Sequence, residues 1–463
     1  MKRILALSLI VFFTLSTASI TRAQAGGPVY VVQAGDSYWG IADAFKVTLN
    51  DLLTINGFTG NHILNPGDRL IIPGYDGIEG ILSTRTVELG ETLSTMALRY
   101  GIPEDTLLRL NRLVNPERLY AGQPLIVVEP DAGAPAPILH ETGQTLSLSA
   151  GTPLLALAAE EGVNPWELVD TNNLSSAADQ FTGQMILETG GAQPLRAWPA
   201  PLTGVSINSL PLVQGTTAEI TLGGLQSSLA EGTLGDSTLM FRPANNGLAA
   251  LQGIYARAKP QTIPLIIKMT LADGRSVYFQ QDVLVEIGDY IIESTDLKVP
   301  PETVDPATIQ AEGDEMKSIV APFTEERYWQ GLFSPPIASP HISSVFGNWR
   351  TYNNKSYGTF HSGVDYYAQE KTPILAPAPG RVVFTDHRVI CGNTTVIDHG
   401  WGVYTRYCHQ SKFEVQVGDM VQTGQVIGLV GHNGRADGPH LHWEVWVGGM
   451  QVNPLDWLKE VFP

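Results

Sequence analysis

The stretch His440-Leu441-His442-Trp443-Glu444-Val445 alternates polar and apolar side chains. In a β-strand, successive side chains point to opposite faces, so this pattern predicts a strand that directs both imidazoles to one side. Leu441 and Trp443 then point to the other side, toward a core. A lone histidine in such a strand is usually structural, but two histidines that flank one apolar residue favour a functional site.

A second stretch, His361-Ser362-Gly363-Val364-Asp365, lies well upstream. Gly363 permits a tight bend that can aim the histidine and the aspartate at one point. A catalytic zinc ion needs three histidine or carboxylate ligands and one open position for water. The two stretches together can supply such a set, and seven of the ten histidines fall between His361 and His442.

Three segments of the N-terminal half share one spacing of small and polar residues. Counted from a first glycine, an alanine recurs at offset 7, an asparagine at offset 21 and a second glycine at offset 32. Coinciding offsets of this kind indicate an internal repeat. The positions are Gly35, Ala42, Asn56 and Gly67, then Gly90, Ala97, Asn111 and Gly122, then Gly151, Ala158, Asn172 and Gly183.

Each repeat is predicted to fold as strand, helix, helix, strand. In the first, Tyr30-Val31-Val32 has strand composition and Ser37 can cap the helix that follows. A second helix is expected over Leu49 to Ile55, and the β-rich run Leu70-Ile71-Ile72 closes the unit. The second repeat has the same order of features.

The pattern changes to β-strand type between residues 195 and 300. Asp273-Gly274, between two such runs, is a hairpin signal, and we predict an immunoglobulin-like β-sandwich. Residues 301–335 are predicted to be a linker with a short helix over Met316 to Val320, and the last domain fills residues 336–463.

Cys391 and Cys408 are the only cysteines, and they flank a predicted hairpin with its turn at Asp398-His399-Gly400-Trp401-Gly402. Strand pairing across that turn would bring the two cysteines nearly opposite each other. A cross-strand disulfide and two separate thiols are both compatible with the sequence.

Residues 1–25 have the features of a secretory signal peptide: Lys2 and Arg3, an apolar run from Ile4 to Leu15, and Ala23-Gln24-Ala25 at the end. The apolar run is shorter than the ~20 residues that span a bilayer. We therefore expect a secreted or periplasmic protein with no membrane span after signal cleavage.

The formal net charge of -18 is concentrated in the N-terminal half: residues 26–190 contain 20 acidic and 7 basic side chains, whereas residues 331–463 contain 10 and 9. Nucleic acids and anionic lipids favour clusters of Lys and Arg, so this acidity argues against both as partners. A neutral or peptide-bearing glycan fits the charge better.

The repeats resemble LysM domains, which bind glycans that contain N-acetylglucosamine. The resemblance is strong for residues 29–73 and 85–128 and weaker for residues 139–189, where Pro153 occupies the usual Ser or Thr position. In this family the sugar lies between the first strand-helix loop and the loop after the second helix. The resemblance nominates Gly35, Asp36, Ser37, Tyr38, Asn61, His62 and Ile63 in the first domain, and Gly90, Glu91, Thr92, Leu93, Pro116 and Glu117 in the second.

The C-terminal domain resembles lysostaphin-type zinc metallopeptidases, which cut peptide bonds of bacterial peptidoglycan. Their signature, His-x-Gly-x-Asp with a later His-x-His, is present, and motifs such as Ala376-Pro377-Ala378-Pro379-Gly380 and Val452-Asn453-Pro454 also follow the family. The resemblance implies a mainly antiparallel β domain with one Zn²⁺. His361, Asp365 and His442 would bind the metal, and His409 and His440 would be catalytic.

These features predict a multidomain chain: α/β LysM modules of βααβ type, a β-sandwich spacer and a β-rich peptidase domain. The hypothesis is a secreted zinc endopeptidase that cuts stem peptides or crosslinks of peptidoglycan while LysM modules bind its glycan strands. The alternative is a noncatalytic wall-binding scaffold or amidase activator, a class that commonly loses metal ligands. Arg350 stands one residue later than the family pattern, and Glu444 could either orient His442 or be a solvated or ion-paired carboxylate.

Overall fold

The computed structural model of the chain gives the course of thirteen segments, and all structural statements concern these residues. The N-terminal segment that has signal-peptide features lies outside them, as do Asn61, Pro116, Glu117 and the Asp273-Gly274 turn. The described residues are 27–58, 62–113, 119–129, 145–147, 153–161, 165–171, 185–187, 202–224, 229–244, 247–270, 276–295, 300–352 and 355–463.

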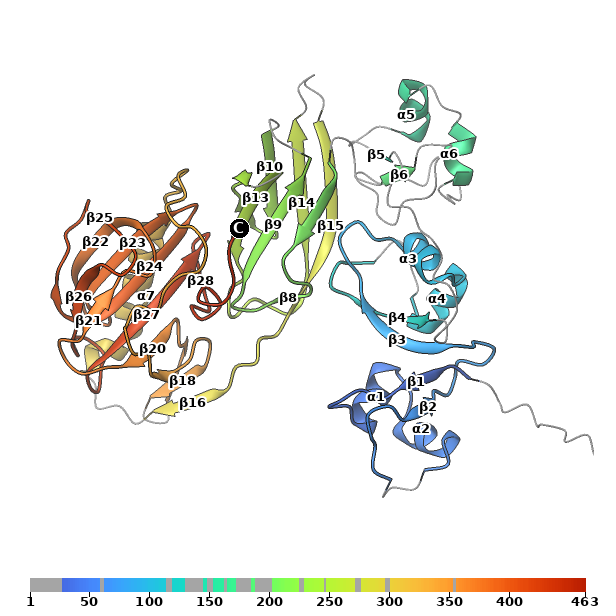
Figure 1. Cartoon of the computed structure of the whole chain (residues 1–463), viewed down its shortest axis with the longest axis horizontal. Helices are drawn as coiled ribbons and strands as arrows, with labels where there is room; N and C mark the ends of the chain where they lie inside the picture. Colours follow the sequence, from blue (N-terminus) through green and yellow to red (C-terminus); the bar gives the residue numbers. More distant parts are fainter. Residues whose placement is uncertain are drawn as a thin grey trace, which may run out of the picture. The chain divides into compact units, whose positions relative to one another are not determined.

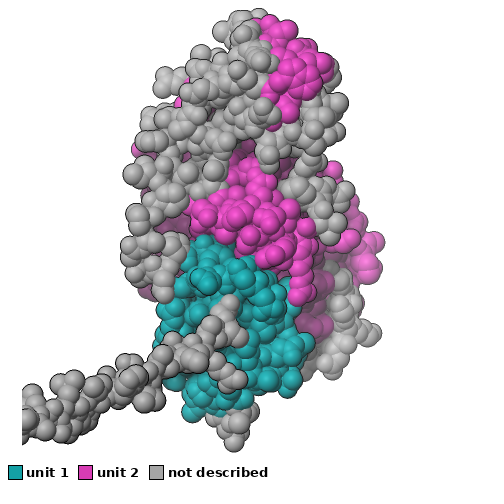
Figure 2. All heavy atoms as spheres, turned by 90° about the vertical axis from the view of Figure 1, so that its right-hand side faces the viewer, with its two compact units in different colours: residues 1–84, 126–136 teal, residues 85–125, 137–463 magenta. Residues whose placement is uncertain are grey.

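The chain forms two compact units, residues 1–84 with 126–136 and residues 85–125 with 137–463, which Figure 2 distinguishes by colour. The first unit holds the first repeat, in the predicted order: β1 (Val29–Val31), α1 (Tyr38–Ala44), α2 (Leu49–Ile55) and β2 (Arg69–Ile71). Strands β1 and β2 pair antiparallel. Ser37 caps α1 as predicted, because its hydroxyl oxygen accepts a hydrogen bond from the backbone N–H of Gly40 (3.0 Å).

The second and third repeats have the same order of elements. The second consists of β3 (Ile81–Thr86), α3 (Leu93–Tyr100), α4 (Glu104–Asn111) and β4 (Pro124–Glu129). In the third, β5 (Thr145–Ser147) and β6 (Met185–Leu187) pair antiparallel around α5 (Leu154–Glu161) and α6 (Pro165–Thr171). The repeated βααβ unit predicted from the residue spacing is therefore confirmed.

The next region is a β-sandwich of two sheets, with strand orders β12-β13-β9-β7 and β11-β10-β14-β15-β8 (Figure 1). Apolar side chains from both sheets, among them Ile220, Leu265 and Val283, form one buried cluster. The strands are β7 (Gly204–Ile207), β8 (Leu212–Val213), β9 (Thr217–Gly223), β10 (Leu229–Leu234), β11 (Ser237–Leu239), β12 (Arg242–Ala244), β13 (Gly247–Gly253), β14 (Gln261–Thr270) and β15 (Ser276–Glu286).

Two boundaries of the predicted domains differ from the structure. Strand β16 (Ile292–Thr295), assigned from the sequence to the sandwich, instead pairs with β18 (Trp349–Tyr352), which in turn pairs with β19 (Lys355–Phe360). The predicted short helix is longer: after a 3-10 turn over Pro301–Val304, α7 runs from Pro306 to Val320. It starts early because the Asp305 side chain caps it and proline is tolerated in a first helical turn.

The C-terminal domain is built on a ten-stranded sheet with the path β17-β20-β27-β24-β23-β22-β25. Its core includes Val364, Val403 and Trp443, and α7 packs Met316 and Val320 against the sheet. The ten strands of this sheet are β17 (Ile342–Ser344), β20 (Val364–Tyr367), β21 (Pro373–Leu375), β22 (Gly380–Arg388), β23 (Gly392–Gly400), β24 (Val403–Phe413), β25 (Met420–Val421), β26 (Val426–Val430), β27 (His440–Val447) and β28 (Met450–Val452).

In the part of the chain that the structure describes, every helix is too short or too polar to traverse a bilayer.

Candidate active site

Two neighbouring strands bring the predicted metal ligands together. Strands β20 and β27 pair antiparallel, and in their register Asp365 lies directly opposite His442. His361 precedes β20, and a Cβ at Gly363 would clash with the carbonyl oxygen of Trp443, so glycine lets this segment approach β27 closely. The glycine thus serves close packing, in addition to the bend expected from the sequence.

Three ligand atoms converge on one point. His361 Nε2 lies 3.0 Å from Asp365 Oδ1 and 3.1 Å from His442 Nδ1, and the latter two atoms are 2.7 Å apart. All three residues are buried. Two imidazole nitrogens and one carboxylate oxygen are a donor set that zinc accepts, and three protein ligands leave a position open. The residues therefore fit a single zinc ion.

Each ligand is oriented by a second group. His361 Nδ1 lies 2.7 Å from the carbonyl oxygen of Val345, to which it donates, so the Nε2 lone pair is left for metal. Arg350 Nη2 donates to the other oxygen of Asp365 at 2.9 Å. His442 Nε2 lies 3.1 Å from Glu444 Oε1, and donation there leaves Nδ1 free in the same way.

The charges around the cluster favour ionised carboxylates. Burial opposes the charge of Asp365, but His361 and His442 hold its pKa well below the usual range. Burial acts against Glu444 too, yet Arg406 and His442 lower the pKa of its carboxyl to about 2. Both carboxylates are therefore present as acceptors at neutral pH.

The two predicted catalytic histidines flank this cluster. The rings of His409 and His440 lie 4.6 Å apart between centroids, and His409 lies 6.2 Å from His442. The Nδ1 atoms of His409 and His440 contact the carbonyl oxygens of Asn433 (2.6 Å) and Gly438 (2.9 Å), so Nε2 of each ring is the nitrogen that can take part in proton transfer. Burial, followed by the charges of His440 and His442, holds the pKa of His409 well below the usual range, so it is neutral at physiological pH.

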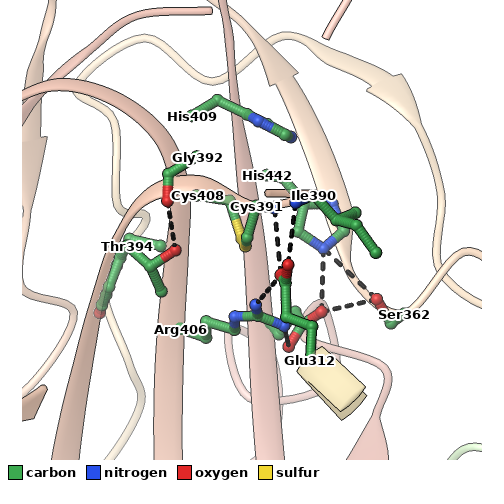
Figure 3. The surroundings of a disulfide bond; sticks show 12 residues. Glu312, Ser362, Ile390, Cys391, Gly392, Thr394, Arg406, Cys408, His409 and His442 are labelled. Carbon is green, nitrogen blue, oxygen red and sulfur yellow. Dashed lines mark hydrogen bonds and ion pairs between the residues drawn. A yellow bond between two sulfur atoms is a disulfide. The ribbon is translucent and has the colours of Figure 1, made fainter. Parts of the chain in front are cut away.

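A cleft of about 270 Å³ contains all five residues. Cys391 and Cys408 form a disulfide beside it, with a Cα separation of 4.9 Å, so of the two arrangements left open by the sequence the structure has the bonded one. Figure 3 shows the disulfide between His409 and the side chain of Arg406.

Sequence reasoning undervalued some residues of the cleft. Arg350 lies in it, against Asp365, although its spacing departs from the family pattern. Glu444 is 1% exposed and bonded to His442, so the solvated alternative is wrong, although it is also paired with Arg406. Glu312 of α7 lines the cleft too and had no signal in the local sequence.

Two other histidines of this domain serve other purposes. His399 is completely buried and lies between the Pro379 carbonyl oxygen (2.7 Å) and the Thr405 hydroxyl (2.8 Å), as a core residue of the sheet. His387 contacts the side chain of Asn393 on the surface. Neither belongs to the cluster of metal-ligand atoms.

In the first repeat, the nominated loop residues are accessible in part. Asp36 accepts hydrogen bonds from Tyr30 Oη and the Gln33 N–H, so its carboxylate stabilises the turn. Tyr38 Oη lies 2.6 Å from His62 Nδ1, and the His62 ring stacks on Phe58 with centroids 4.0 Å apart. Aromatic faces are suited to contact sugar rings. Ile63 is exposed, and Gly35 has open space around it.

In the second repeat, the corresponding loop is covered. Gly90 donates its N–H to Gln281 Oε1 of β15 (2.8 Å), and Glu91 and Leu93 are each 3% exposed. Glu91 pairs with Arg99. Gly90, Glu91 and Leu93 are thus buried, because the loop packs on the sandwich, and Thr92 is exposed. Contact of these residues with a glycan stays a prediction.

Family models agree with this division of the chain. Residues 359–454 match Peptidase family M23, and residues 30–73 and 86–128 each match the LysM domain. The third repeat lies outside both matched LysM segments.

Relatives match about a quarter of this chain. The DD-carboxypeptidase/endopeptidase Mpg of Neisseria meningitidis serogroup B is 41% identical over 125 residues, which are 27% of this chain and 29% of the relative. The peptidoglycan DD-endopeptidase ShyA of Vibrio cholerae serotype O1 is 44% identical over 114 residues, 25% and 26% of the two chains. The chain thus matches less than a third of the length of these relatives.

Among solved structures, the catalytic domain of the antimicrobial peptidase lysostaphin from Staphylococcus simulans is 29% identical, with 26% of this chain and 93% of that chain covered and a TM-score of 0.24. The family matches and the converging ligand atoms together define the domains of the chain. The chain carries two LysM domains and, at its C-terminal end, a domain of peptidase family M23.

Proposed function

We propose that the protein is a secreted zinc metalloendopeptidase that hydrolyses peptide bonds in peptidoglycan and is held at the cell wall by LysM binding to glycan strands. The observation that carries the proposal is one cleft that combines three convergent metal ligands with two further histidines. A scaffold protein has no use for such a complete set.

The chain's own groups divide into holding and proton-transfer roles. His361, Asp365 and His442 would hold one zinc ion, which supplies Lewis-acid polarisation of a carbonyl and acidification of water. One of the two remaining imidazoles accepts the proton of the attacking water through Nε2 and returns it to the leaving amine. The other, when protonated, stabilises the oxyanion.

The relatives support peptidoglycan as the substrate class. Two are named for DD-endopeptidase or DD-carboxypeptidase activity, and the LysM matches point to the glycan part of the same polymer. Binding through a LysM domain raises the local concentration of the peptidase on an insoluble substrate without any new contact in the cleft. We assign this role first to the first repeat, where Tyr38, Phe58 and His62 form an accessible aromatic cluster.

The proposal is tested by digestion of purified peptidoglycan and mass analysis of the fragments. Wild-type protein should release peptide fragments in a chelator-sensitive way. His442→Ala should lose both zinc and cleavage. His409→Ala should retain zinc but lose cleavage by about 10²–10⁴-fold, the usual contribution of a proton-transfer group.

Binding is measured separately by sedimentation with peptidoglycan. His442→Ala and His409→Ala should still sediment with the polymer. Cleavage by His442→Ala at the wild-type rate would refute the assignment of the site, and wild-type sedimentation without any cleavage would favour the scaffold alternative.

A further inference from the structure

We propose that Glu312, on helix α7 and outside the segment that matches the peptidase family, is a positioning residue that holds both His409 and His442 in place. Its part in turnover rests on the proposed function, whereas its effect on zinc binding does not. The helix would then belong to the active site, although the sequence places it in a linker.

The carboxylate of Glu312 binds two backbone N–H groups and one guanidinium group at once. One oxygen accepts the N–H of Ile390 (2.8 Å), and the other accepts the N–H of Cys391 (3.1 Å) and pairs with Arg406 Nη2 (2.8 Å). The side chain is only 9% exposed. Figure 3 shows this carboxylate between the two backbone nitrogens and the guanidinium group. A buried carboxylate is retained where such partners replace its lost water.

The first connection leads to His409. The carbonyl oxygen of Cys391 accepts the backbone N–H of His409 at 2.7 Å, and the Cys391–Cys408 disulfide ties the same segment to the residue before His409. The carbonyl oxygen of Ile390 accepts the Arg435 N–H (2.7 Å). The polar backbone groups of Ile390 and Cys391 are thus all bonded, and two of the four depend on Glu312.

His409 needs this support because its backbone is strained. Its φ angle is +61°, in the left-handed region that a non-glycine residue seldom adopts. Such a conformation persists only when surrounding contacts determine it. Loosening residues 390 and 391 would therefore release the backbone of His409 and move its imidazole from the cleft.

The second connection leads to His442. Arg406 lies directly opposite Glu444 in the pairing of β24 with β27, and its Nη1 lies 3.7 Å from Glu444 Oε2. Glu444 in turn bonds His442 Nε2. Glu312 and Glu444 thus hold one guanidinium group between them. Without Glu312, Arg406 would be drawn toward Glu444, and the carboxylate would compete less well for the imidazole N–H.

The test compares Glu312→Gln with Glu315→Gln in the full chain. Glu315 is on the same helix and pairs with Arg388 (2.6 Å), but it is 45% exposed and does not line the cleft, so it is a matched control. Zinc affinity is measured by competition with a chromophoric chelator. Turnover is measured on soluble crosslinked muropeptides, with the melting temperature as a check of folding.

We expect Glu312→Gln to lower kcat about tenfold, with KM within about twofold, and to weaken zinc binding about threefold to tenfold, at the low end of effects on groups that orient ligands. Glu315→Gln should match the wild type. Equal zinc affinity and equal turnover in the two variants would overturn the proposal.

Glu312→Asp covers the case in which Glu312→Gln does not fold. It keeps the charge beside Arg406, but the shorter side chain cannot reach both N–H groups as well, so a smaller loss of the same kind is expected. Wild-type behaviour of Glu312→Asp in both measurements would overturn the proposal. Absence of cleavage by the wild type would refute the proposed function but not the role of Glu312. The zinc affinities of the variants would still test that role.

Discussion

Replacement of Glu444 by glutamine removes one charge from the cleft without changing the shape of the side chain. In the native protein Oε1 accepts hydrogen bonds from Ser362 Oγ (2.6 Å) and His442 Nε2 (3.1 Å), and Oε2 accepts one from Trp446 Nε1 (2.7 Å). All three partners are donors. A carboxylate accepts from each of them, whereas a primary amide offers only one acceptor atom.

Either orientation of the new amide therefore causes a conflict. If its oxygen faces His442, its NH₂ group faces the N–H of Trp446. If its oxygen faces Trp446, its NH₂ group faces His442 Nε2 and favours the tautomer with a proton on Nδ1, the atom that would bind metal. Loss of such an orienting carboxylate typically weakens metal binding about 10- to 100-fold, or ~1.4–2.7 kcal/mol. Arg406 keeps Glu312 as a partner, so the fold should persist.

The assay is competitive zinc titration of Glu444→Gln at fixed pH, with Glu414→Gln as the control. Glu414 belongs to the same domain but pairs with Lys412 at the surface, and it does not line the cleft. Circular dichroism and melting of the metal-free proteins check that both variants fold. A zinc affinity within about threefold of the wild type would refute the reasoning, because the orienting bond would then contribute little.

Three further predictions concern the same domain. Arg350→Met removes the donor to Asp365 Oδ2 and should weaken zinc binding about tenfold in the same titration; a change below about twofold would contradict this. Burial lowers the pKa of His399 to about 4 from 6.5, so its neutral ring contributes stability in full above pH 6.5, and roughly 3 kcal/mol is lost as the pH falls toward 4. Urea unfolding at several pH values should show that the free energy of unfolding falls less steeply with decreasing pH in His399→Gln than in the wild type. The same pH dependence in both proteins would exclude His399 as the cause. Replacing both Cys391 and Cys408 by alanine should lower the free energy of unfolding by about 3 kcal/mol relative to the disulfide-bonded wild type, measured by urea unfolding. The reduced wild type should show the same loss, and a loss below about 1 kcal/mol would contradict this.

The residue pattern predicted both stretches of the candidate metal site because their geometry is local, and the family resemblance assigned the ligands within them. The alternation of side chains lies within one strand, β27, and His361 and Asp365 lie within one short segment. The pairing of β20 with β27 then brings the two stretches together. The prediction was weaker for Arg350. The pairing of β18 with β19 shifts register between Trp349 and Thr351, and such an irregularity re-aims a side chain. A comparison of spacings alone does not contain that shift.

Contacts between distant segments could not be predicted in this way. The first glycine is shared by the loops of both LysM repeats, but its packing differs: Gly90 is bonded to Gln281 of β15, whereas Gly35 has open space around it. The same limit explains why the sequence predicts a linker over most of α7. The prolines that precede it and its own acidic residues are typical of linkers, but Asp305 and Pro306 begin a helix whose role depends on residues far along the chain.

Some residues that orient the site lie outside the segment that matches the peptidase family. The segment that matches the peptidase family, residues 359–454, contains every proposed ligand and both proton-transfer histidines. It lacks Val345, which orients His361, as well as Arg350 and Glu312. Metal ligands need such partners to fix their tautomers and directions. A fragment limited to the matched residues would thus retain the chemical groups but lose much of their orientation. If Glu312 has the proposed role, we expect the functional domain to include α7, which Asp305 caps.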